Sequence, residues 1–315
     1  MQLDKNKLYS AKRRAGNISV SIIRGVFLFG ICFTVLYPLI SKIFVSFMNI
    51  SDIFNSNIRY IPNEFTLKNY LAALEILKFP KSFINSFSMS FLVSVFQLLG
   101  ALVVGYGLSR FNFKGKNLLF ILLIISMIIP PDLLLLPRYF QFRFFDIFGL
   151  FESISGESIS LLDTYIPYLA LGITCVGLKN GLYVFMLRQY FMGLPASLEE
   201  AAYVDGAGPI KTFARVILPG AVPMAVTVFL FSFVWQWNDS IITPVISSQS
   251  DLVSILMPSV PGQASGALGL GSSSMFASSL VTNAGIILMV LPVLFVYLFF
   301  QRYFVQSIER SGLVG

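Results

Sequence analysis

Six long apolar segments run along this chain, separated by shorter polar stretches. They span residues 22–48, 84–109, 117–137, 164–187, 220–246 and 280–303. About twenty consecutive apolar residues are enough for a helix to cross the hydrocarbon core of a bilayer. The pattern therefore predicts an all-α, polytopic membrane protein with six transmembrane helices over residues 22–303, flanked by tails at 1–21 and 304–315.

Composition and charge agree with a membrane protein and exclude other classes. Hydrophobic residues make up 56% of the 315 positions and charged residues 12%, whereas soluble domains carry about 25% charged residues. The lipid bilayer is therefore the expected surrounding. The net charge of +7 is spread along the chain and does not mark one soluble face, so we expect no nucleic-acid partner.

Lysine and arginine are distributed unevenly between alternate loops. Fourteen of the 22 lie in or beside the two tails and in the loops after the second and fourth apolar segments, whereas the other loops hold six. Because cytoplasmic loops carry the excess of basic residues, both termini and the loop at 188–219 are predicted to face the cytoplasm. The first apolar segment has no small-residue cleavage site, which favours a retained span over a signal peptide.

Two local patterns stand out in the loops predicted to lie outside. The stretch from Leu67 to Leu77 is amphipathic, as expected of a helix lying on a membrane surface. Residues 247–279 are rich in Gly and Ser. The run from Gly262 to Ser274 lacks the Gly-Lys-Ser/Thr ending of a nucleotide-binding P-loop, so we interpret it as a flexible connection.

The polar loop at 188–219 contains signals for two short helices. Ser197 and Glu200 have the spacing of a capping box, and acidic residues in a first turn interact favourably with the helix dipole. Gly206 is placed to end this helix in the left-handed conformation. Pro209 suits the start of a second helix, and Pro219 leads into the fifth apolar segment.

The same loop offers small residues to its surroundings. Ala201 and Ala202 are adjacent in the first short helix, and small side chains allow another backbone to approach closely. The loop is therefore either a docking site for a partner protein or an ordinary, well-capped connection between spans.

One sequence motif distinguishes these alternatives. Glu200-Ala201-Ala202 is followed after three residues by Gly206 and after nine more by Val216-Ile217-Leu218-Pro219. This spacing resembles the EAA loop of ABC importer permeases, with Val216 in place of the usual isoleucine. Leu194-Pro195, Trp237-Asn238-Asp239 and the ending Phe300 to Val305 are similar to carbohydrate importers of the maltose-permease class, most closely its MalG-like half.

The resemblance implies a fold, partners and a mechanism. The fold would be that of a type I ABC importer permease in a bacterial cell membrane. The chain would pair with a second permease subunit, contact a dimer of cytoplasmic ABC ATPases, and receive a sugar, such as an oligosaccharide, from an extracytoplasmic solute-binding protein. It would bind no cofactor and catalyse no reaction itself, because the ATPase subunits use ATP and Mg²⁺.

The resemblance also assigns roles to residues of the loop. Glu200 is expected to pair with a basic residue of the ATPase, and Gly206 to permit the turn between the short helices. The residues expected to couple the chain to the ATPase are Ser197, Glu199, Glu200, Ala201, Ala202, Asp205, Gly206 and Pro219.

Polar residues within the apolar segments are a second group of candidates, because charges inside a membrane are costly and usually functional. They would line a translocation path or, alternatively, hold helices together or reach to the interface. The candidates are Lys179, Asn180, Gln236, Trp237, Asn238 and Asp239.

Two other function classes compete with an ABC importer. An intramembrane enzyme would need convergent catalytic groups, but the chain has no histidine and its acidic residues are scattered. A channel or a secondary transporter that is not coupled to ATP is the stronger rival. It is expected to show inverted repeats or broken helices with ion ligands, and the sequence shows neither.

Overall fold

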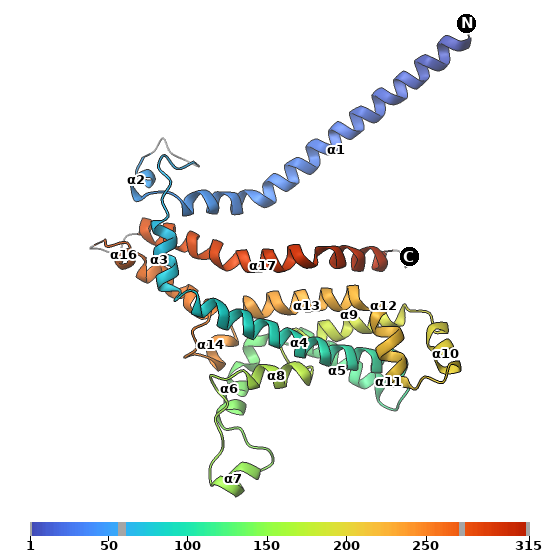
Figure 1. Cartoon of the computed structure of the whole chain (residues 1–315), viewed down its shortest axis with the longest axis vertical. Helices are drawn as coiled ribbons and strands as arrows, with labels where there is room; N and C mark the ends of the chain where they lie inside the picture. Colours follow the sequence, from blue (N-terminus) through green and yellow to red (C-terminus); the bar gives the residue numbers. More distant parts are fainter. Residues whose placement is uncertain (1, 56–60, 271–274, 313–315) are drawn as a thin grey trace. The chain divides into compact units, whose positions relative to one another are not determined.

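The computed structural model describes residues 2–55, 61–270 and 275–312, and in this part of the chain the backbone is almost entirely helical (Figure 1). Within these ranges the β-pairing consists of one isolated bridge between Phe145 and Ile159. The predicted all-α class is therefore confirmed. The chain forms two compact units, Met1–Ala73 with Pro261–Ile287, and Leu74–Val260 with Leu288–Gly315.

The helical segments follow one another with short connections. In chain order they are α1 (Gln2–Ser46), α2 (Ile50–Ile53), α3 (Lys68–Ile76), α4 (Lys81–Arg110), α5 (Lys116–Ile128), η1 (Pro131–Leu134), α6 (Leu135–Arg143), α7 (Leu150–Ser155), α8 (Ile166–Ile173), α9 (Asn180–Met192), α10 (Ser197–Val204), α11 (Pro209–Thr212), the π-helical η2 (Phe213–Ile217), α12 (Leu218–Gly220), α13 (Val222–Trp237), α14 (Thr243–Ile246), α15 (Val253–Leu256), η3 (Met257–Ser259), α16 (Val260–Ala267) and α17 (Met275–Gly312).

The six apolar segments predict six spans, but fewer unbroken helices are long enough to span a bilayer. Among the described residues three qualify, at Val20–Ser46, Lys81–Arg110 and Met275–Ser307. Two bent pairs, which turn by 103° after Ile128 and by 78° after Gly220, raise the number to five. The fourth predicted span is interrupted, because α8 ends at Ile173 and α9 begins at Asn180. The count of six is therefore not established.

In the first unit, polar contacts hold the short segments that follow α1. The Asn69 amide donates to the carbonyl oxygens of Ser46 at 3.0 Å and Met48 at 2.8 Å. The Ser46 hydroxyl lies 2.8 Å from the Tyr70 hydroxyl. In contrast to these contacts, the side chains of α1 from residue 20 to residue 38 are all exposed.

The Gly-rich connection differs in part from the sequence prediction. Residues 260–267 form α16, although the run from Gly262 was interpreted as flexible. The Ser278 hydroxyl donates to the Pro261 carbonyl at 2.6 Å, which ties the start of α16 to α17. Residues 271–274 lie outside the described part of the chain.

The second unit packs around α4, which contacts α8, α9 and α13. Glycine makes this contact close. A Cβ atom at Gly100 would lie 2.7 Å from the Ile173 carbonyl oxygen, and one at Gly105 would lie 3.1 Å from the Leu187 Cβ. Small residues let membrane helices approach one another in this way. Tyr183 and Leu187 of α9, both fully buried, complete the core.

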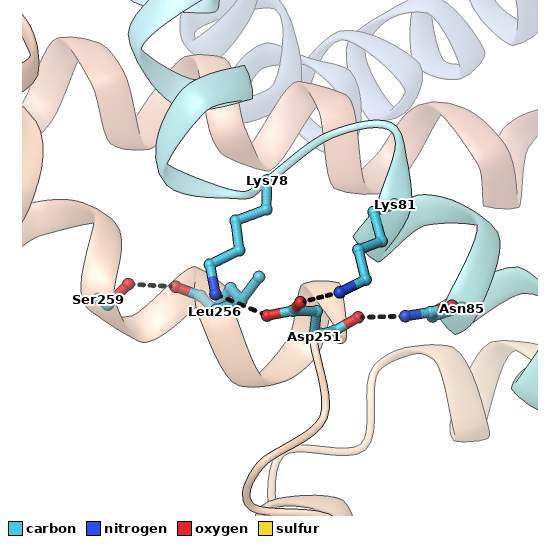
Figure 2. Close-up of polar contacts among 6 residues, drawn as sticks. All are labelled: Lys78, Lys81, Asn85, Asp251, Leu256 and Ser259. Atoms are coloured by element: carbon cyan, nitrogen blue, oxygen red, sulfur yellow. Dashed lines mark hydrogen bonds and ion pairs between the residues drawn. The ribbon is translucent and has the colours of Figure 1, made fainter.

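An ion-pair cluster fastens the loops at the Lys81 end of α4 (Figure 2). Asp251, just before α15, accepts from Lys78 Nζ at 2.7 Å and from Lys81 Nζ at 2.9 Å. The Asn85 amide donates to the Asp251 carbonyl at 3.3 Å. The hydrogen bonds from the two lysines lower the pKa of the Asp251 carboxyl group below its ordinary value.

The close packing of α4 predicts opposite effects for two glycine substitutions. Gly100→Ala forces a backbone carbonyl away and should destabilise the protein by about 1–3 kcal/mol. Gly107→Ala, on the same helix, meets no atom within 4 Å and should be neutral or stabilising by up to about 1 kcal/mol, because alanine favours helix. Thermal unfolding of the purified chain in detergent measures both. Equal effects would contradict the packing argument.

The Asp251 cluster predicts a pH-dependent contribution to stability. Because the folded-state pKa lies below the ordinary 3.8, the ion pairs stabilise the fold above that pH, and the effect is lost as the pH falls through the folded-state pKa. Asp251→Asn should lower the melting temperature near neutral pH, and its difference from wild type should shrink below about pH 4. Asp205→Asn, which removes an exposed carboxylate outside this cluster, is the control.

Candidate coupling segment and helix breaks

The first short helix of the predicted coupling loop is α10, and Gly206 ends it as predicted. Gly206 has φ +79°. Its N–H donates to the Tyr203 carbonyl at 3.0 Å, and the Ala207 N–H donates to the Ala202 carbonyl at 2.9 Å. This pair of bonds is a Schellman motif, which satisfies carbonyl groups left free at a helix end.

The predicted capping box is wrong. The residue before the helix is Ala196, which has a helical backbone and makes no side-chain capping bond. The Glu199 and Glu200 N–H groups donate to the Ala196 carbonyl instead. Ser197 is therefore already inside the first turn, so it does not take the N-cap role that a capping box requires.

Glu199, one of the predicted coupling residues, faces inward. Glu199 is 8% exposed. Its Oε1 lies 3.0 Å from Nε of Arg110, the last residue of α4. Arg110 Nη2 also donates to the Leu194 carbonyl at 2.8 Å. One arginine thus joins α4 to both the entry and the first turn of α10.

The other predicted coupling residues divide between the two sides of the segment. Ala202 is buried, whereas Ala201 is exposed, so these alanines do not form one accessible face. Two apolar side chains are strongly exposed, Val204 at 87% and Ile210 at 85%. The remaining exposed members of the predicted set are Ser197, Glu200, Asp205, Gly206 and Pro219.

Aromatic side chains pack beneath α10. Tyr106 of α4 lies with its ring centroid 4.6 Å from that of Phe213 and 5.6 Å from that of Phe191. Tyr106 and Phe191 are buried in the cluster that also contains Ile217. The coupling segment is therefore packed on the ends of α4 and α9.

The second half of the segment leads into α13 through a sharp bend. α11 begins at Pro209, as predicted, and continues through η2 and α12 to Gly220. The chain then turns by 78° into α13. Pro223 has no N–H to continue the helical bonding, and the Gly220 carbonyl accepts from the Tyr190 hydroxyl at 2.7 Å. A side chain of α9 therefore satisfies a carbonyl at the bend.

Comparison with known proteins places this geometry in a family. The family model described as binding-protein-dependent transport system inner membrane component matches residues 97–310, more than half of the chain. The chain belongs to this family. It is a permease subunit of an ABC transporter, and the matched range contains the whole coupling segment and both bent helix pairs.

Individual relatives match over nearly their whole length. The arabinooligosaccharides transport system permease protein AraQ of Halalkalibacterium halodurans is 27% identical over 288 residues, covering 90% of this chain and 93% of AraQ. The diacetylchitobiose uptake system permease protein NgcG of Streptomyces coelicolor is 28% identical over 277 residues, covering 88% of this chain and 83% of NgcG.

A solved structure confirms the permease fold. It is the crystal structure of a bacterial ABC transporter involved in the import of the acidic polysaccharide alginate. The match to one of its chains covers 90% of this permease and 96% of that chain, with a TM-score of 0.65 and 23% sequence identity. The predicted type I ABC importer permease fold is thereby supported.

The polar residues predicted for a translocation path do not form a single site. Trp237 is buried, with its indole N–H donating to the Met289 carbonyl at 3.0 Å. Asn238 is exposed and donates to the Val234 carbonyl at 2.8 Å. Gln236 donates from Nε2 to the Thr243 hydroxyl at 3.2 Å.

Asp239 organises the turn that follows α13. Its Oδ1 accepts the N–H groups of Ile241 and Ile242, both at 3.1 Å. Its Oδ2 accepts the N–H and the hydroxyl of Thr243, both at 2.8 Å. The carboxylate is therefore saturated by its own loop, so its buried position is explained by structure.

Lys179 and Asn180 meet at a cavity between two helix breaks. The cavity holds about 340 Å³ and lies between the α5–η1 break and the α8–α9 break. Asn180 is fully buried and donates to the Gly172 carbonyl at 3.1 Å. Arg138 of α6 lines the same cavity and donates to the Val176 carbonyl at 2.6 Å.

Sequence reasoning missed Arg110 and Arg138. Arg110 ends an apolar segment, where a basic residue is expected for topology alone. Arg138 was counted as a loop residue because the third apolar segment was ended at 137. The signal that could have found Arg138 is its place directly after Pro137, a few residues beyond the Pro130-Pro131 pair, since prolines inside a span free carbonyl groups that need donors.

The Arg110–Glu199 pair predicts a stability difference between adjacent glutamates. Glu199→Ala leaves a nearly buried guanidinium without its carboxylate and should destabilise the fold by about 3 kcal/mol. Glu200→Ala, on the exposed side of the same turn, should change stability by less than about 0.5 kcal/mol. Denaturant unfolding of the full chain in detergent measures both variants.

A double variant separates the ion pair from simple packing. Arg110→Met combined with Glu199→Leu removes both charges together, and replacing a buried pair by apolar residues is often neutral. The double variant should therefore be more stable than Glu199→Ala. Additive losses from the two positions would count against a direct pair.

Proposed function

We propose that this permease forms one half of the membrane channel of a sugar importer and couples to a cytoplasmic ATPase through residues 197–206. A second permease subunit would complete the channel, and a solute-binding protein would deliver the sugar. The relatives AraQ and NgcG, which this chain matches over 93% and 83% of their lengths, are named for arabinooligosaccharide transport and diacetylchitobiose uptake. Their names support a carbohydrate substrate.

The observation that carries this proposal is the anchoring of α10. Its inner side is fixed to α4 by the 3.0 Å Arg110–Glu199 ion pair, while Glu200 and Asp205 on its outer side are exposed. No cation lies within ion-pair distance of Glu200 in the described part of the chain. An exposed carboxylate on a fixed helix suits a basic residue on a partner surface.

Exposed apolar side chains support the same docking surface. Val204 and Ile210 flank the turn at Gly206 and are 87% and 85% exposed. Apolar side chains rimmed by polar ones are typical of protein interfaces. The ATPase would cover these two residues and contact Glu200 beside them.

The sidedness of the proposal follows from charge. Arg110, Lys114 and Lys116 lie at the same end of the second unit as the coupling segment, in the loop from α4 to α5. The basic residues of this loop favour the cytoplasmic side. We therefore place the coupling segment and both termini in the cytoplasm, and the Lys78–Lys81–Asp251 cluster outside.

The packing suggests how ATPase closure would move the spans. A shift of α10 would reach α4 directly through Arg110, and a shift of η2 would reach α13 through the bend at Gly220. The first connection is a nearly buried ion pair, and at the second the Tyr190 hydroxyl donates to the Gly220 carbonyl. The two paths would carry one movement to different parts of the bundle.

A pair of glycine substitutions tests the docking of this segment. Gly206→Asp should leave the permease in the membrane but uncouple ATP hydrolysis from uptake. A Cβ at Gly206 or at Gly208 meets no atom of this chain within 4 Å. Lost coupling therefore reports on the partner surface or on the left-handed turn. Gly208→Asp, two residues away with φ −75°, is the matched control and should retain more coupling.

The measurement is ATP hydrolysis by the reconstituted complex, with and without the loaded binding protein, alongside co-purification of the ATPase. Normal uptake by Gly206→Asp would overturn the docking assignment. Failure of the wild-type chain to co-purify with an ATPase would instead overturn the proposed coupling through residues 197–206.

A further inference from the structure

We propose that the cavity between the two helix breaks binds an acidic sugar, with Arg138 and Lys179 holding its carboxylate or phosphate group. The inference rests on the proposed transport function and narrows its substrate class. It depends on four features of the cavity: its depth, its charges, its unpaired acceptor and its backbone conformation.

The cavity lies partway along the helices of the second unit, on a side where lining residues such as Ile128 and Val176 are exposed. α5 has 13 residues from Lys116 to its break, and α9 has 13 residues from its start to Met192. Each length corresponds to about 20 Å. The cavity is therefore about one such helix away from the coupling segment, which is deep within a hydrocarbon core of about 30 Å.

Two cations, Arg138 and Lys179, line this cavity outside any close ion pair. The ion pairs within 4 Å among the described residues involve Lys78, Lys81 and Arg110, and neither Arg138 nor Lys179. Asp239 borders an adjoining small void that Arg138 also lines, and its charge acts on Arg138, although no ion pair within 4 Å joins the two. Cations at membrane depth are costly and mark substrate pathways by default.

The two cations have capacity left for a ligand. Arg138 donates from Nη2 to the Val176 carbonyl, and a guanidinium has five N–H donors. Lys179 Nζ lies 4.8 Å from the ring centre of Trp235, as a cation–π contact. Arginine can bind a carboxylate or phosphate through two parallel bonds, and lysine can add a point charge.

A neutral acceptor and a helix end complete the site. Asn180 Oδ1 is an unpaired acceptor in the wall of the cavity, with less than 1 Å² exposed, so it can accept from a sugar hydroxyl once the Asn180 side chain turns toward the cavity. The N-terminus of α9, at Asn180 and Gly181, lines the same cavity, and the positive end of a broken helix favours an anionic substrate group. The donor and acceptor set therefore matches a polyhydroxylated anion.

The backbone at the break is held in an uncommon conformation. Cys175 and Lys179 have φ +60° and φ +59°, in the left-handed region that side chains other than glycine rarely adopt. Such residues persist where the surrounding structure fixes them, and they concentrate at functional sites. Here the two turns bring Lys179 and Asn180 to the cavity wall.

The test compares an acidic disaccharide with its neutral counterpart. Cellobiouronate and cellobiose differ by one carboxylate in place of a hydroxymethyl group, and a phosphorylated cellobiose distinguishes phosphate from carboxylate. Binding is measured by calorimetry on the full-length chain with its partner subunits in nanodiscs, without ATP. Association with the ATPase is scored separately on the same preparation, so a failure of coupling is distinguishable from a failure of this site.

Wild type should bind an anionic probe about tenfold or more tightly than cellobiose, a difference worth about 1.4 kcal/mol. The combined variant Arg138→Gln and Lys179→Gln should lose this preference. Arg143→Gln, an exposed arginine on the same helix α6 outside the cavity lining, should keep it. The pair Arg138→Lys and Lys179→Arg retains both charges and should keep part of the preference if the neutral pair fails to fold.

Three results would overturn the proposal. Equal binding of charged and neutral probes would remove the anion selectivity. A preference that survives in the Gln variants would place the anion elsewhere. Loss of the second permease from the Gln variants, together with no anion preference in wild type, would assign the two cations to an ion pair between subunits.

Discussion

Backbone carbonyl groups freed at helix breaks must find donors within the protein, because the lipid core supplies none. The second unit is organised by this constraint. Its helices are interrupted at three places, after Ile128, Ile173 and Gly220. Side chains from neighbouring elements supply donors around the last two breaks: Asn180 to the Gly172 carbonyl at 3.1 Å, Gln97 to the Leu178 carbonyl at 3.2 Å, Arg138 to the Val176 carbonyl at 2.6 Å and Tyr190 to the Gly220 carbonyl at 2.7 Å.

This constraint explains why polar residues within apolar segments have mixed roles. Asn180 and Arg138 both donate to a freed carbonyl and line the cavity, so structure and ligand binding draw on the same side chains. Asp239 and Trp237 are fully engaged by structural bonds. A polar residue at membrane depth is therefore a functional candidate only when it keeps donors or acceptors beyond those that the backbone requires.

The sequence was sufficient for features that depend on local pattern. Hydrophobic runs predicted the helical membrane class, although not the number of spans. The glycine at 206 and the proline at 209 located the turn and the second short helix, because each needs only the conformation of its own backbone. Features that depend on packing were not visible. The break before Asn180 has no proline beside it, because Pro167, the proline of this apolar run, lies at the start of α8. The left-handed residues at the break, Cys175 and Lys179, are types that rarely adopt that conformation.

Glu199 shows why the coupling surface could not be assigned from the motif alone. The sequence does not show which of the two adjacent glutamates contacts the partner. Successive helical residues point about 100° apart, so one glutamate faces inward when the other faces out. Arg110, about ninety positions earlier, determines which is which. The inward glutamate fixes the helix and leaves its neighbour free for a partner. Replacing Glu199 should therefore damage coupling by releasing the helix, whereas replacing Glu200 should damage it with the helix still in place.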